Sequence, residues 1–418
     1  MEGGEWVRKL LIRGGKPLSG EIQISGSKNA ALPMLAATVA FREPCLIRGC
    51  PDLTDVDAAL EILAFLGAEI RRNGPEIYVN PKTISRWAIP DGLMGKMRGS
   101  VFFAGPLMAR FGKCRLAMPG GCPLGERPVD FHALGLMALG AKAGNGDPTL
   151  FSGTMTGREI HLPYPSVGAT ENLLMAALGA EGATVIRNAA REPEIVCLCA
   201  FLRSGGARID GDGTGEIRIS GGLPGSGVHT VIPDRNETAT FACAAASAGG
   251  EIRLQGTRHL HLTAVLDVLE RSGCRIRRNE HDIEIASGDR KSPGVVETGP
   301  YPGFPTDAQA TVMAALLQAE GETEIRETVF PKRMGHVEGL RMLGGDIVQE
   351  ENRARIRKTE KLSGAPVTAT DLRGGAALTV AALAAHGQTE ISGLHHILRG
   401  YENFAGKLRA LGADARLT

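Results

Sequence analysis

The stretch LAFLGAEI, residues 63–70, decides the fold because the chain repeats its pattern. The five further copies are LMALGAKA (136–143), LRSGGARI (202–209), LERSGCRI (269–276), LRMLGGDI (340–347) and LRALGADA (408–415). Each copy is typical of an amphipathic helix that ends at a left-handed glycine and is followed by a strand. The central glycines lie 66 to 73 residues apart. This period is too long for the common solenoids and indicates repeated α/β subdomains.

A second pattern precedes each copy: an alanine-rich apolar helix, a glycine or proline, and a short alternating strand. Clear examples are AALGAEGATVIRN (176–188), LLQAEGETEIRE (316–327) and LAAHGQTEISG (383–393). The predicted unit is therefore helix, strand, helix and one or two strands. Six such units fit either one array or two groups of three. The segment GGLPGSGVHTVIPDRN (221–236) is the natural crossing point between two halves, and a cleft between halves is the default ligand site.

The composition excludes several classes of protein. With 418 residues, 43% apolar and 22% charged, the chain is expected to be globular, with two or three domains. A net charge of +1 argues against a nucleic-acid partner. We find no apolar run suited to a signal peptide or membrane span, so we expect a cytoplasmic protein without membrane association. Eight cysteines without CxxC spacing indicate neither a disulfide framework nor a zinc site, and most should be small core residues.

One cysteine lies in an enlarged loop, MPGGCPLGERPVD (118–130). From the last large apolar residue of the strand to the glycine, the second repeat spans 24 residues, whereas the others span 19 to 21. Cys122 lies five residues before Arg127, and a nearby cation lowers the pKa of a thiol. We therefore expect either a reactive thiol at Cys122 or an incidental loop cysteine.

Other candidates lie at predicted helix starts, where free amides and the helix dipole favour an anion. Lys28 and Asn29 precede the apolar run LPMLAATVA, Arg98 precedes another apolar helix, and Ser166 is a predicted N-cap beside Gly168. Each of these residues also has an ordinary interpretation as a solvated or capping residue.

Acids and arginines recur near the C-terminal repeats. Asp307 lies in FPTDAQA, Asp371 and Arg373 in ATDLRGG, and His396 and Arg399 in HHILRGYEN. Asp307 and Asp371 taken singly are typical helix caps. Together with the thiol and the five cations (Lys28, Arg98, Arg127, Arg373 and Arg399), they suit a small substrate that carries a phosphate and a carboxylate. No Walker loop or GxGxxG fingerprint indicates a triphosphatase or a dehydrogenase.

A set of motifs in fixed order carries a family resemblance. They are SGSKNAALP (25–33), ARFG (109–112), PGGC (119–122), RPVD (127–130), SVGAT (166–170), NAAREPEIV (188–196), PDRNET (233–238), FPTD (304–307), ETVF (327–330), ATDLR (369–373) and HHILRGYEN (395–403). The chain thus resembles, nearly end to end, the UDP-N-acetylglucosamine 1-carboxyvinyltransferases, a family of enolpyruvyl transferases. The related 5-enolpyruvylshikimate-3-phosphate synthases carry a GNAGT-type segment where this chain reads GKMRGSVFF (95–103).

The resemblance implies a two-domain inside-out α/β barrel of the enolpyruvyl transferase type, with six βαβαββ-type repeats, three per domain. The first domain would be residues 27–233, with a mobile cysteine loop at about 118–128. The second domain would combine residues 1–26 and 234–418, and the active site would lie in the cleft between the domains.

The implied reaction moves the enolpyruvyl group of phosphoenolpyruvate to the 3-hydroxyl of UDP-N-acetylglucosamine and releases phosphate, the first committed step of peptidoglycan precursor synthesis. By the same resemblance, Lys28, Arg127 and Arg399 bind phosphoenolpyruvate, Arg98 helps to position substrate, and Asn29 binds the reacting sugar region. Asp307 is the expected base, with Asp371 beside it stabilising charge. Cys122 is the expected acid and can carry a covalent phospholactoyl or pyruvate-derived adduct.

For the nucleotide end, the resemblance implies a uracil pocket, a diphosphate site and a sugar pocket. The expected residues are Arg127, Pro128, Val129, Asp130 and Phe131 around uracil, the amides of Ser166, Val167 and Gly168 at the diphosphate, and Val329 at the sugar. The chain departs from the family pattern at Phe131, Pro331, Lys332, Cys197, Ala200 and Leu398.

We expect no cofactor or metal, with phosphoenolpyruvate as a co-substrate, and no obligate protein partner. Two alternatives stay open: a paralogue that uses another nucleotide or nucleotide-sugar acceptor, and a catalytically silent regulatory homologue.

Overall fold

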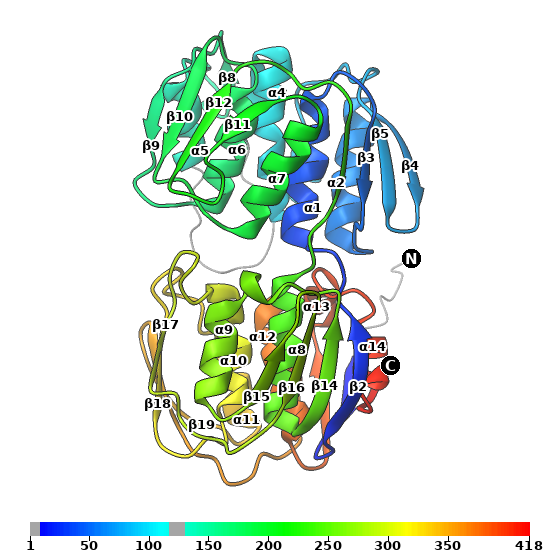
Figure 1. Cartoon of the computed structure of the whole chain (residues 1–418), viewed down its shortest axis with the longest axis vertical. Helices are drawn as coiled ribbons and strands as arrows, with labels where there is room; N and C mark the ends of the chain where they lie inside the picture. Colours follow the sequence, from blue (N-terminus) through cyan, green and yellow to red (C-terminus); the bar gives the residue numbers. More distant parts are fainter. Residues whose placement is uncertain (1–8, 117–129) are drawn as a thin grey trace. The chain divides into compact units, whose positions relative to one another are not determined.

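The computed structural model of the chain describes residues 9–116 and 130–418. Cys122, Arg127, Pro128 and Val129 of the expected site lie outside the described residues. Each predicted repeat corresponds to one sheet, and the described residues contain six sheets. The predicted fold class is confirmed by this arrangement and by the solved structures described below. The described residues divide into two compact units (Figure 1).

The first unit comprises residues 26–116 and 130–232. Its sheets have the orders β13-β3-β5-β4, β11-β12-β10-β9 and β6-β8-β7. The strands are β3 (Cys45–Arg48), β4 (Glu69–Asn73), β5 (Glu76–Asn80), β6 (Lys113–Arg115), β7 (Lys142–Ala143), β8 (Leu150–Ser152), β9 (Glu159–His161), β10 (Ala183–Arg187), β11 (Arg208–Asp210), β12 (Glu216–Ser220) and β13 (Gly227–Thr230). The helices are α1 (Lys28–Ala37), α2 (Thr54–Leu66), α3 (Asp91–Met94), α4 (Ala104–Phe111), α5 (Asp130–Ala138), α6 (Val167–Ala177) and α7 (Pro193–Ser204), with 3-10 turns η1 (Thr38–Ala40) and η2 (Arg98–Phe103).

The second unit comprises residues 9–25 and 233–418. Its sheets have the orders β21-β22-β1-β23, β15-β16-β14-β2 and β17-β18-β20-β19. The strands are β1 (Leu10–Arg13), β2 (Leu18–Gln23), β14 (Gly250–Gln255), β15 (Arg275–Arg278), β16 (Asp282–Ala286), β17 (Val295–Glu297), β18 (Thr323–Arg326), β19 (Asp346–Glu350), β20 (Arg353–Arg357), β21 (Pro366–Thr368), β22 (Gln388–Ser392) and β23 (Asp414–Leu417). The helices are α8 (Arg235–Ala248), α9 (Thr263–Arg271), α10 (Thr306–Ala315), α11 (Val337–Met342), α12 (Leu372–Ala384), α13 (Leu394–Leu398) and α14 (Phe404–Ala410), with the turn η3 (His259–His261).

Two strands that precede the first unit in the sequence belong to sheets of the second unit. β2 runs parallel to β14, and β1 runs antiparallel to both β22 and β23. In the sheet of the fourth repeat, the last strand of that repeat, β16, lies between β14 and β15. In the sheet of the sixth repeat, β1 occupies the corresponding position between β22 and β23. The sixth repeat is completed by residues from the other end of the described chain.

The alanine-rich helices form the centre of each unit. In the second unit α8, α10 and α12 pack against one another (Figure 1). Nearly all their residues are buried. In the first unit α1 and α6 are likewise apolar and almost fully buried, whereas α4 is buried in its first five residues and packs on α6. A helix that is apolar on all sides requires cover on all sides. The sheets supply it with their apolar faces, as the alternating burial of β10, β18 and β22 shows.

The six glycines of the repeat adopt the predicted left-handed backbone. Their φ angles are 108° at Gly67, 106° at Gly140, 93° at Gly206, 100° at Gly273, 99° at Gly344 and 84° at Gly412. Only glycine enters this region without a steric penalty, so these residues end the outer helices and direct the chain into the next strand. The interpretation of the repeated phrase is confirmed.

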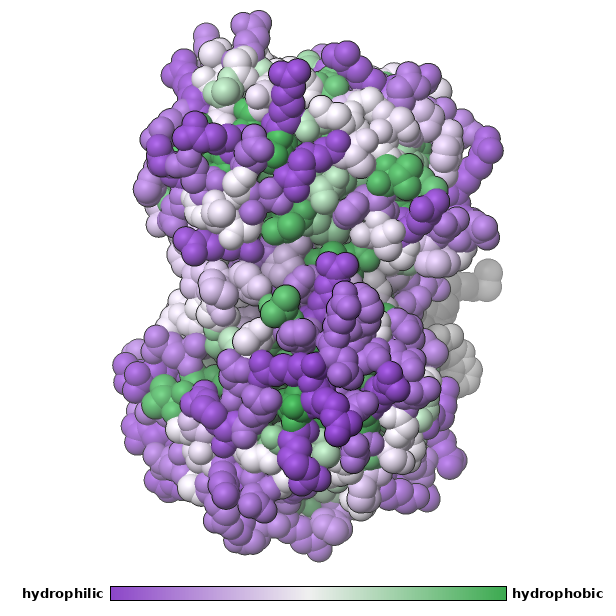
Figure 2. All heavy atoms as spheres, viewed as in Figure 1, coloured by the Kyte–Doolittle hydropathy of each residue, from purple (hydrophilic) through white to green (hydrophobic). Residues whose placement is uncertain are grey.

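The exterior is mostly polar. Figure 2 shows apolar residues as separate spots on a largely hydrophilic face. Within the described ranges, none of the helices has both the length and the apolar composition needed to cross a membrane.

Replacing a repeat glycine by alanine is expected to destabilise the second unit, by an amount that depends on the space around it. At Gly273 a Cβ would lie 1.8 Å from the carbonyl oxygen of Asp289, whereas at Gly412 the nearest atom is 4.0 Å away. Gly412→Ala should cost only the backbone strain, about 1–2 kcal/mol, and Gly273→Ala about 3 kcal/mol or more. Scanning calorimetry of both variants checks this; equal losses of Tm would contradict the steric argument.

Candidate active site

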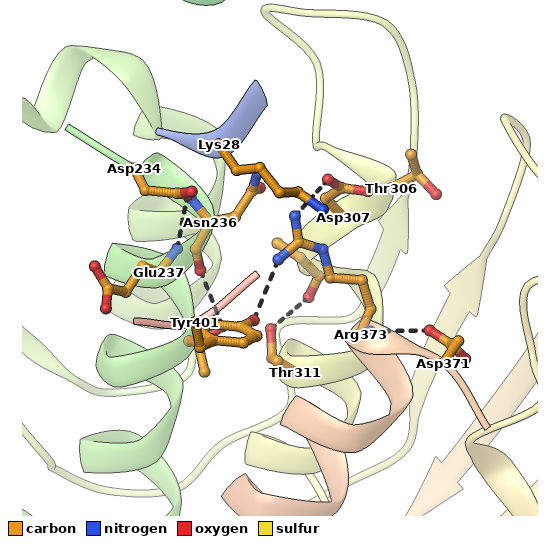
Figure 3. Close-up of polar contacts among 12 residues, drawn as sticks. Lys28, Asp234, Asn236, Glu237, Thr306, Asp307, Thr311, Asp371, Arg373 and Tyr401 are labelled. Carbon is orange, nitrogen blue, oxygen red and sulfur yellow. Dashed lines mark hydrogen bonds and ion pairs between the residues drawn. The ribbon is translucent and has the colours of Figure 1, made fainter. Parts of the chain in front are cut away.

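Asp307 lies between two arginines in the second unit. It is the second residue of α10, and Arg373 is the second residue of the neighbouring α12. Asp307 Oδ2 accepts from Arg373 Nη2 at 2.8 Å, and Oδ1 pairs with Arg333 Nη1 at 2.7 Å. The arginine side chains are only 6% exposed, whereas Asp307 is 26% exposed. Figure 3 shows Asp307 and Arg373 pointing toward each other. The N-cap of α10 is Pro305, so the interpretation of Asp307 as an ordinary cap is wrong.

The two arginines determine the charge state of Asp307. Burial by itself would raise the pKa of Asp307, but the charges of Arg373 and Arg333 and their hydrogen bonds outweigh burial. The pKa is therefore held well below its ordinary value. At neutral pH Asp307 is therefore a carboxylate that can accept a hydrogen bond or a proton from a hydroxyl group.

Asp371 and Tyr401 position Arg373. Asp371 is the N-cap of α12, and its Oδ1 accepts from the amides of Arg373 and Gly374 at 2.9 and 3.0 Å, which confirms its interpretation as a cap. Arg373 Nη1 donates to the hydroxyl of Tyr401 at 3.2 Å, as Figure 3 shows, and this hydroxyl lies 2.8 Å from Thr240 Oγ1. The guanidinium of Arg373 thus contacts Asp307 through Nη2 and Tyr401 through Nη1, and these two contacts fix its orientation.

Arg399 and Val329 are the remaining expected residues of the second unit. Arg399 is half-buried and follows the short helix α13, which contains His396 and was not predicted. Burial, and then the charges of His395 and Arg399, lower the pKa of His396, against the opposite effect of Asp371. Val329 is half-buried, and its amide donates to Glu327 at 2.9 Å.

In the first unit, Lys28 is held by an acid that the sequence analysis missed. Lys28 is the first residue of α1, as predicted, and Asn29 follows it. Lys28 Nζ lies 2.9 Å from Oδ2 of Asp55, in the first turn of α2, and these side chains are 13% and 6% exposed. A buried partner fixes the ammonium group far better than solvent would.

The start of α6 is organised by a buried histidine. Ser166 caps α6 as predicted, and Gly168 faces the ring of His132. Asn172 Nδ2 lies 2.8 Å from His132 Nδ1 and donates to the carbonyl of Val101, while its Oδ1 accepts from an amide. The amide group is therefore oriented to donate to Nδ1, which leaves the ring proton on Nε2.

Arg98 acts on the same histidine. It begins the turn η2 that leads into α4, as predicted, and burial lowers its pKa. Burial, and then the charge of Arg98, lower the pKa of His132 to about 4, so this ring is neutral. His132 belongs to α5, which also carries Asp130, exposed, and Phe131, half-buried. The structure thus groups the expected diphosphate residues with Arg98 and with a histidine that the sequence analysis missed.

A carboxyl group is buried on α6. Both side-chain oxygens of Glu171 on α6 are buried without a hydrogen-bond partner among the described residues. Burial, and then the charges of Glu194 and Glu192, raise its pKa well above the ordinary value. Glu171 therefore holds its proton to a higher pH than an exposed glutamate does.

The described cysteines carry no candidate chemistry. Seven of the eight are described, and all seven are free and buried. Burial raises the pKa of Cys45, Cys50, Cys114 and Cys243 to about 12. Most cysteines were predicted to be core residues, and this is confirmed. In the described part of the chain, no three His, Cys, Asp or Glu side chains form a group able to hold a metal ion.

Comparisons with known proteins identify the class. The family model described as EPSP synthase (3-phosphoshikimate 1-carboxyvinyltransferase) matches residues 12–408. The solved enolpyruvyl transferase NikO from Streptomyces tendae has a TM-score of 0.89 and 27% identity, with 98% of this chain and 99% of that chain covered. An EPSP synthase from Acinetobacter baumannii, 19% identical over 98% of this chain and 99% of its own, shares the fold with a TM-score of 0.76. The fold and the matched family are those of the enolpyruvyl transferases.

Sequence relatives narrow the class. A UDP-N-acetylglucosamine 1-carboxyvinyltransferase from Gloeobacter violaceus is 46% identical over 97% of this chain and 89% of its own length. UDP-N-acetylglucosamine 1-carboxyvinyltransferase 1 from Halalkalibacterium halodurans is 44% identical over 98% of this chain and 94% of its own length. The chain belongs to the UDP-N-acetylglucosamine 1-carboxyvinyltransferase family.

Substituting Glu171 by glutamine should stabilise the protein at alkaline pH. Because the folded state raises the pKa of Glu171, its favourable contribution is complete below the ordinary pKa of about 4.3 and is lost as pH rises toward the raised value. Glu171→Gln removes this loss, so its Tm should exceed that of the wild type by several degrees at pH 8, but not at pH 4.5. The exposed Glu181→Gln is the control; a Tm difference independent of pH would contradict the assignment.

Proposed function

We propose that this chain transfers the enolpyruvyl group of phosphoenolpyruvate to the 3-hydroxyl of UDP-N-acetylglucosamine and releases phosphate. The observation that carries the proposal is 43 to 46% identity, over 97 to 98% of the chain, to five proteins that bear the name of this activity. The ionised Asp307 supports it, because the reaction needs an acceptor for a hydroxyl proton. The two compact units are proposed to be the two domains of this family.

The proposed reaction has an addition and an elimination. In the addition, the acceptor oxygen bonds to C2 of phosphoenolpyruvate, its proton passes to Asp307, and C3 receives a proton. In the elimination, the bond from C2 to the phosphate oxygen breaks and C3 loses a proton, which leaves an enolpyruvyl ether and phosphate. Positive character develops at C2 during protonation, and a carboxylate nearby stabilises it.

The charge state of Asp307 suits the first step. A carboxylate paired with Arg333 and Arg373 is ionised at neutral pH, but its lowered pKa makes it a weak base. An anionic substrate that draws on the same arginines weakens their hold and strengthens the base. Binding of phosphoenolpyruvate would thereby prepare Asp307 for the acceptor hydroxyl.

The other roles follow from the family resemblance. Lys28, Arg127 and Arg399 are proposed to bind phosphoenolpyruvate, with Arg98 and Asn29 at the acceptor. Cys122 is the proposed acid toward C3. The amides at the start of α6, capped by Ser166, suit the diphosphate because a helix N-terminus favours an anion. Asp130 and Phe131 are proposed at uracil and Val329 at the sugar, in a cytoplasmic step of peptidoglycan precursor synthesis.

Phosphate release tests the reaction. The wild type should release phosphate from phosphoenolpyruvate only when UDP-N-acetylglucosamine is present. Cys122→Ala and Asp307→Asn should lower kcat by about 10²–10⁴-fold, because each removes a proposed proton donor or acceptor. Circular dichroism verifies folding of both variants. Turnover with another nucleotide sugar alone would assign a paralogous activity, and binding without turnover a silent homologue.

Thiol labelling tests Cys122 separately. The seven described cysteines are buried, so the epoxide fosfomycin at pH 7 should alkylate Cys122 alone. Peptide mass spectrometry of the native protein, with Cys122→Ala as control, provides the measurement. Equal labelling of several cysteines would contradict a specially activated thiol.

A further inference from the structure

Glu327 is fully buried and collects four hydrogen bonds directly after β18. Its Oε1 accepts from Thr298 Oγ1 and from the amides of Val329 and Phe330, each at 2.9 Å. Its Oε2 accepts from Thr306 Oγ1 at 2.8 Å. The side chain has no access to solvent, so these four contacts define its surroundings.

For the two threonine hydroxyls, a further donor fixes the direction of the hydrogen bond to Glu327. Thr298 Oγ1 already accepts from the amide of Thr328 at 2.8 Å, and Thr306 Oγ1 accepts from Arg333 Nη1 at 3.1 Å. Each hydroxyl therefore directs its own proton at Glu327. Only a group that accepts at both oxygens fits four donors, which is a property of carboxylate and not of an amide.

The two oxygens lead to different parts of the candidate site. From Oε2, the chain of contacts runs through Thr306 to Arg333 and then to Asp307 at 2.7 Å. The Nε of Arg333 is buried without a hydrogen-bond partner in the described structure, so the contacts of Nη1 are important for holding this guanidinium. From Oε1, the contacts hold the backbone of residues 328–330, which includes Val329.

We propose that Glu327 is a positioning residue with two separable tasks: Oε2 orients Arg333 and thereby Asp307, and Oε1 shapes the loop 328–330 that lines the acceptor pocket. The inference rests on the proposed function, in which Asp307 is the base and Val329 contacts the sugar. Glu327 itself touches no substrate.

Two isosteric substitutions separate the tasks. Thr306→Val and Thr298→Val each remove one hydroxyl that joins Glu327 to one further donor. Thr306→Val should lower kcat about tenfold with little change in the KM for UDP-N-acetylglucosamine, because Arg333 is no longer fixed against Asp307. Thr298→Val should raise that KM about threefold and leave kcat close to the wild-type value. Glu327→Gln should show both effects, because one donor then faces an amide NH₂.

The pH profile adds a readout that a merely structural role would not move. Loosening Arg333 weakens its attraction for Asp307, so the pKa of Asp307 rises toward its ordinary value while Arg373 remains. The acidic limb of kcat/KM should therefore move to higher pH in Thr306→Val and stay in place in Thr298→Val. Equal profiles, or equal changes of kcat and KM in the two variants, would overturn the proposal.

Acid unfolding tests the orientation of Asp307 without any turnover. A carboxylate with a lowered pKa stabilises the fold above its ordinary pKa, and this contribution is lost as pH falls through the lowered value. Thr306→Val should lose stability at a higher pH than Thr298→Val, measured as Tm from pH 7 to pH 3. Coincident curves would overturn the positioning role. A wild type that releases no phosphate would instead overturn the proposed function, while these curves still decide the orientation of Asp307.

Discussion

The structure depends on burying helices that have no polar side. α8, α10 and α12 are enclosed by one another, by sheet strands and by outer helices, so their flanks cannot carry chemistry. Only the first turn of an inner helix is free of this enclosure and can present a polar side chain to a ligand. Lys28 on α1, Ser166 at α6, Asp307 on α10 and Arg373 on α12 all stand there. The enclosure that stabilises each unit therefore also decides where its candidate residues lie.

This placement has an electrostatic consequence. A helix N-terminus carries partial positive charge, so a cation in the first turn is unfavourable without an anion beside it. Lys28 is accompanied by Asp55, and Arg373 by Asp307, with Arg333 added from a loop. Two arginines thus share one carboxylate at Asp307, which leaves a surplus of positive charge there, whereas Lys28 and Asp55 balance each other. A phosphorylated carboxylic acid such as phosphoenolpyruvate complements such surroundings.

The sequence predicted the architecture better than the contacts. The left-handed glycines, the strands near residues 183, 323 and 388, and the helix starts at Lys28 and Ser166 follow from local patterns, which propensity and turn chemistry explain. The sequence analysis missed Asp55, Arg333, Tyr401 and Glu327. The contacts that join them to Lys28, Asp307, Arg373 and Thr306 span 21 to 28 residues, and spacing does not specify which side chains meet. His132 had a weak signal, since it lies two residues after RPVD. Glu171 had none, because a sequence does not distinguish a buried glutamate from an exposed one.

The pairing of β1 and β2 makes the first unit an insertion within the second. β1 joins strands that follow it by more than 370 residues, whereas the described residues of the first unit all lie between residues 26 and 232. The ribosome therefore completes the strands of the first unit, ending with β13, before it makes β14 to β23 of the second unit. β1 and β2 emerge first but must wait, as unpaired sheet edges, until β14 and β22 are synthesised. During synthesis, all strands of the first unit are therefore available before the second unit can pair β1 and β2.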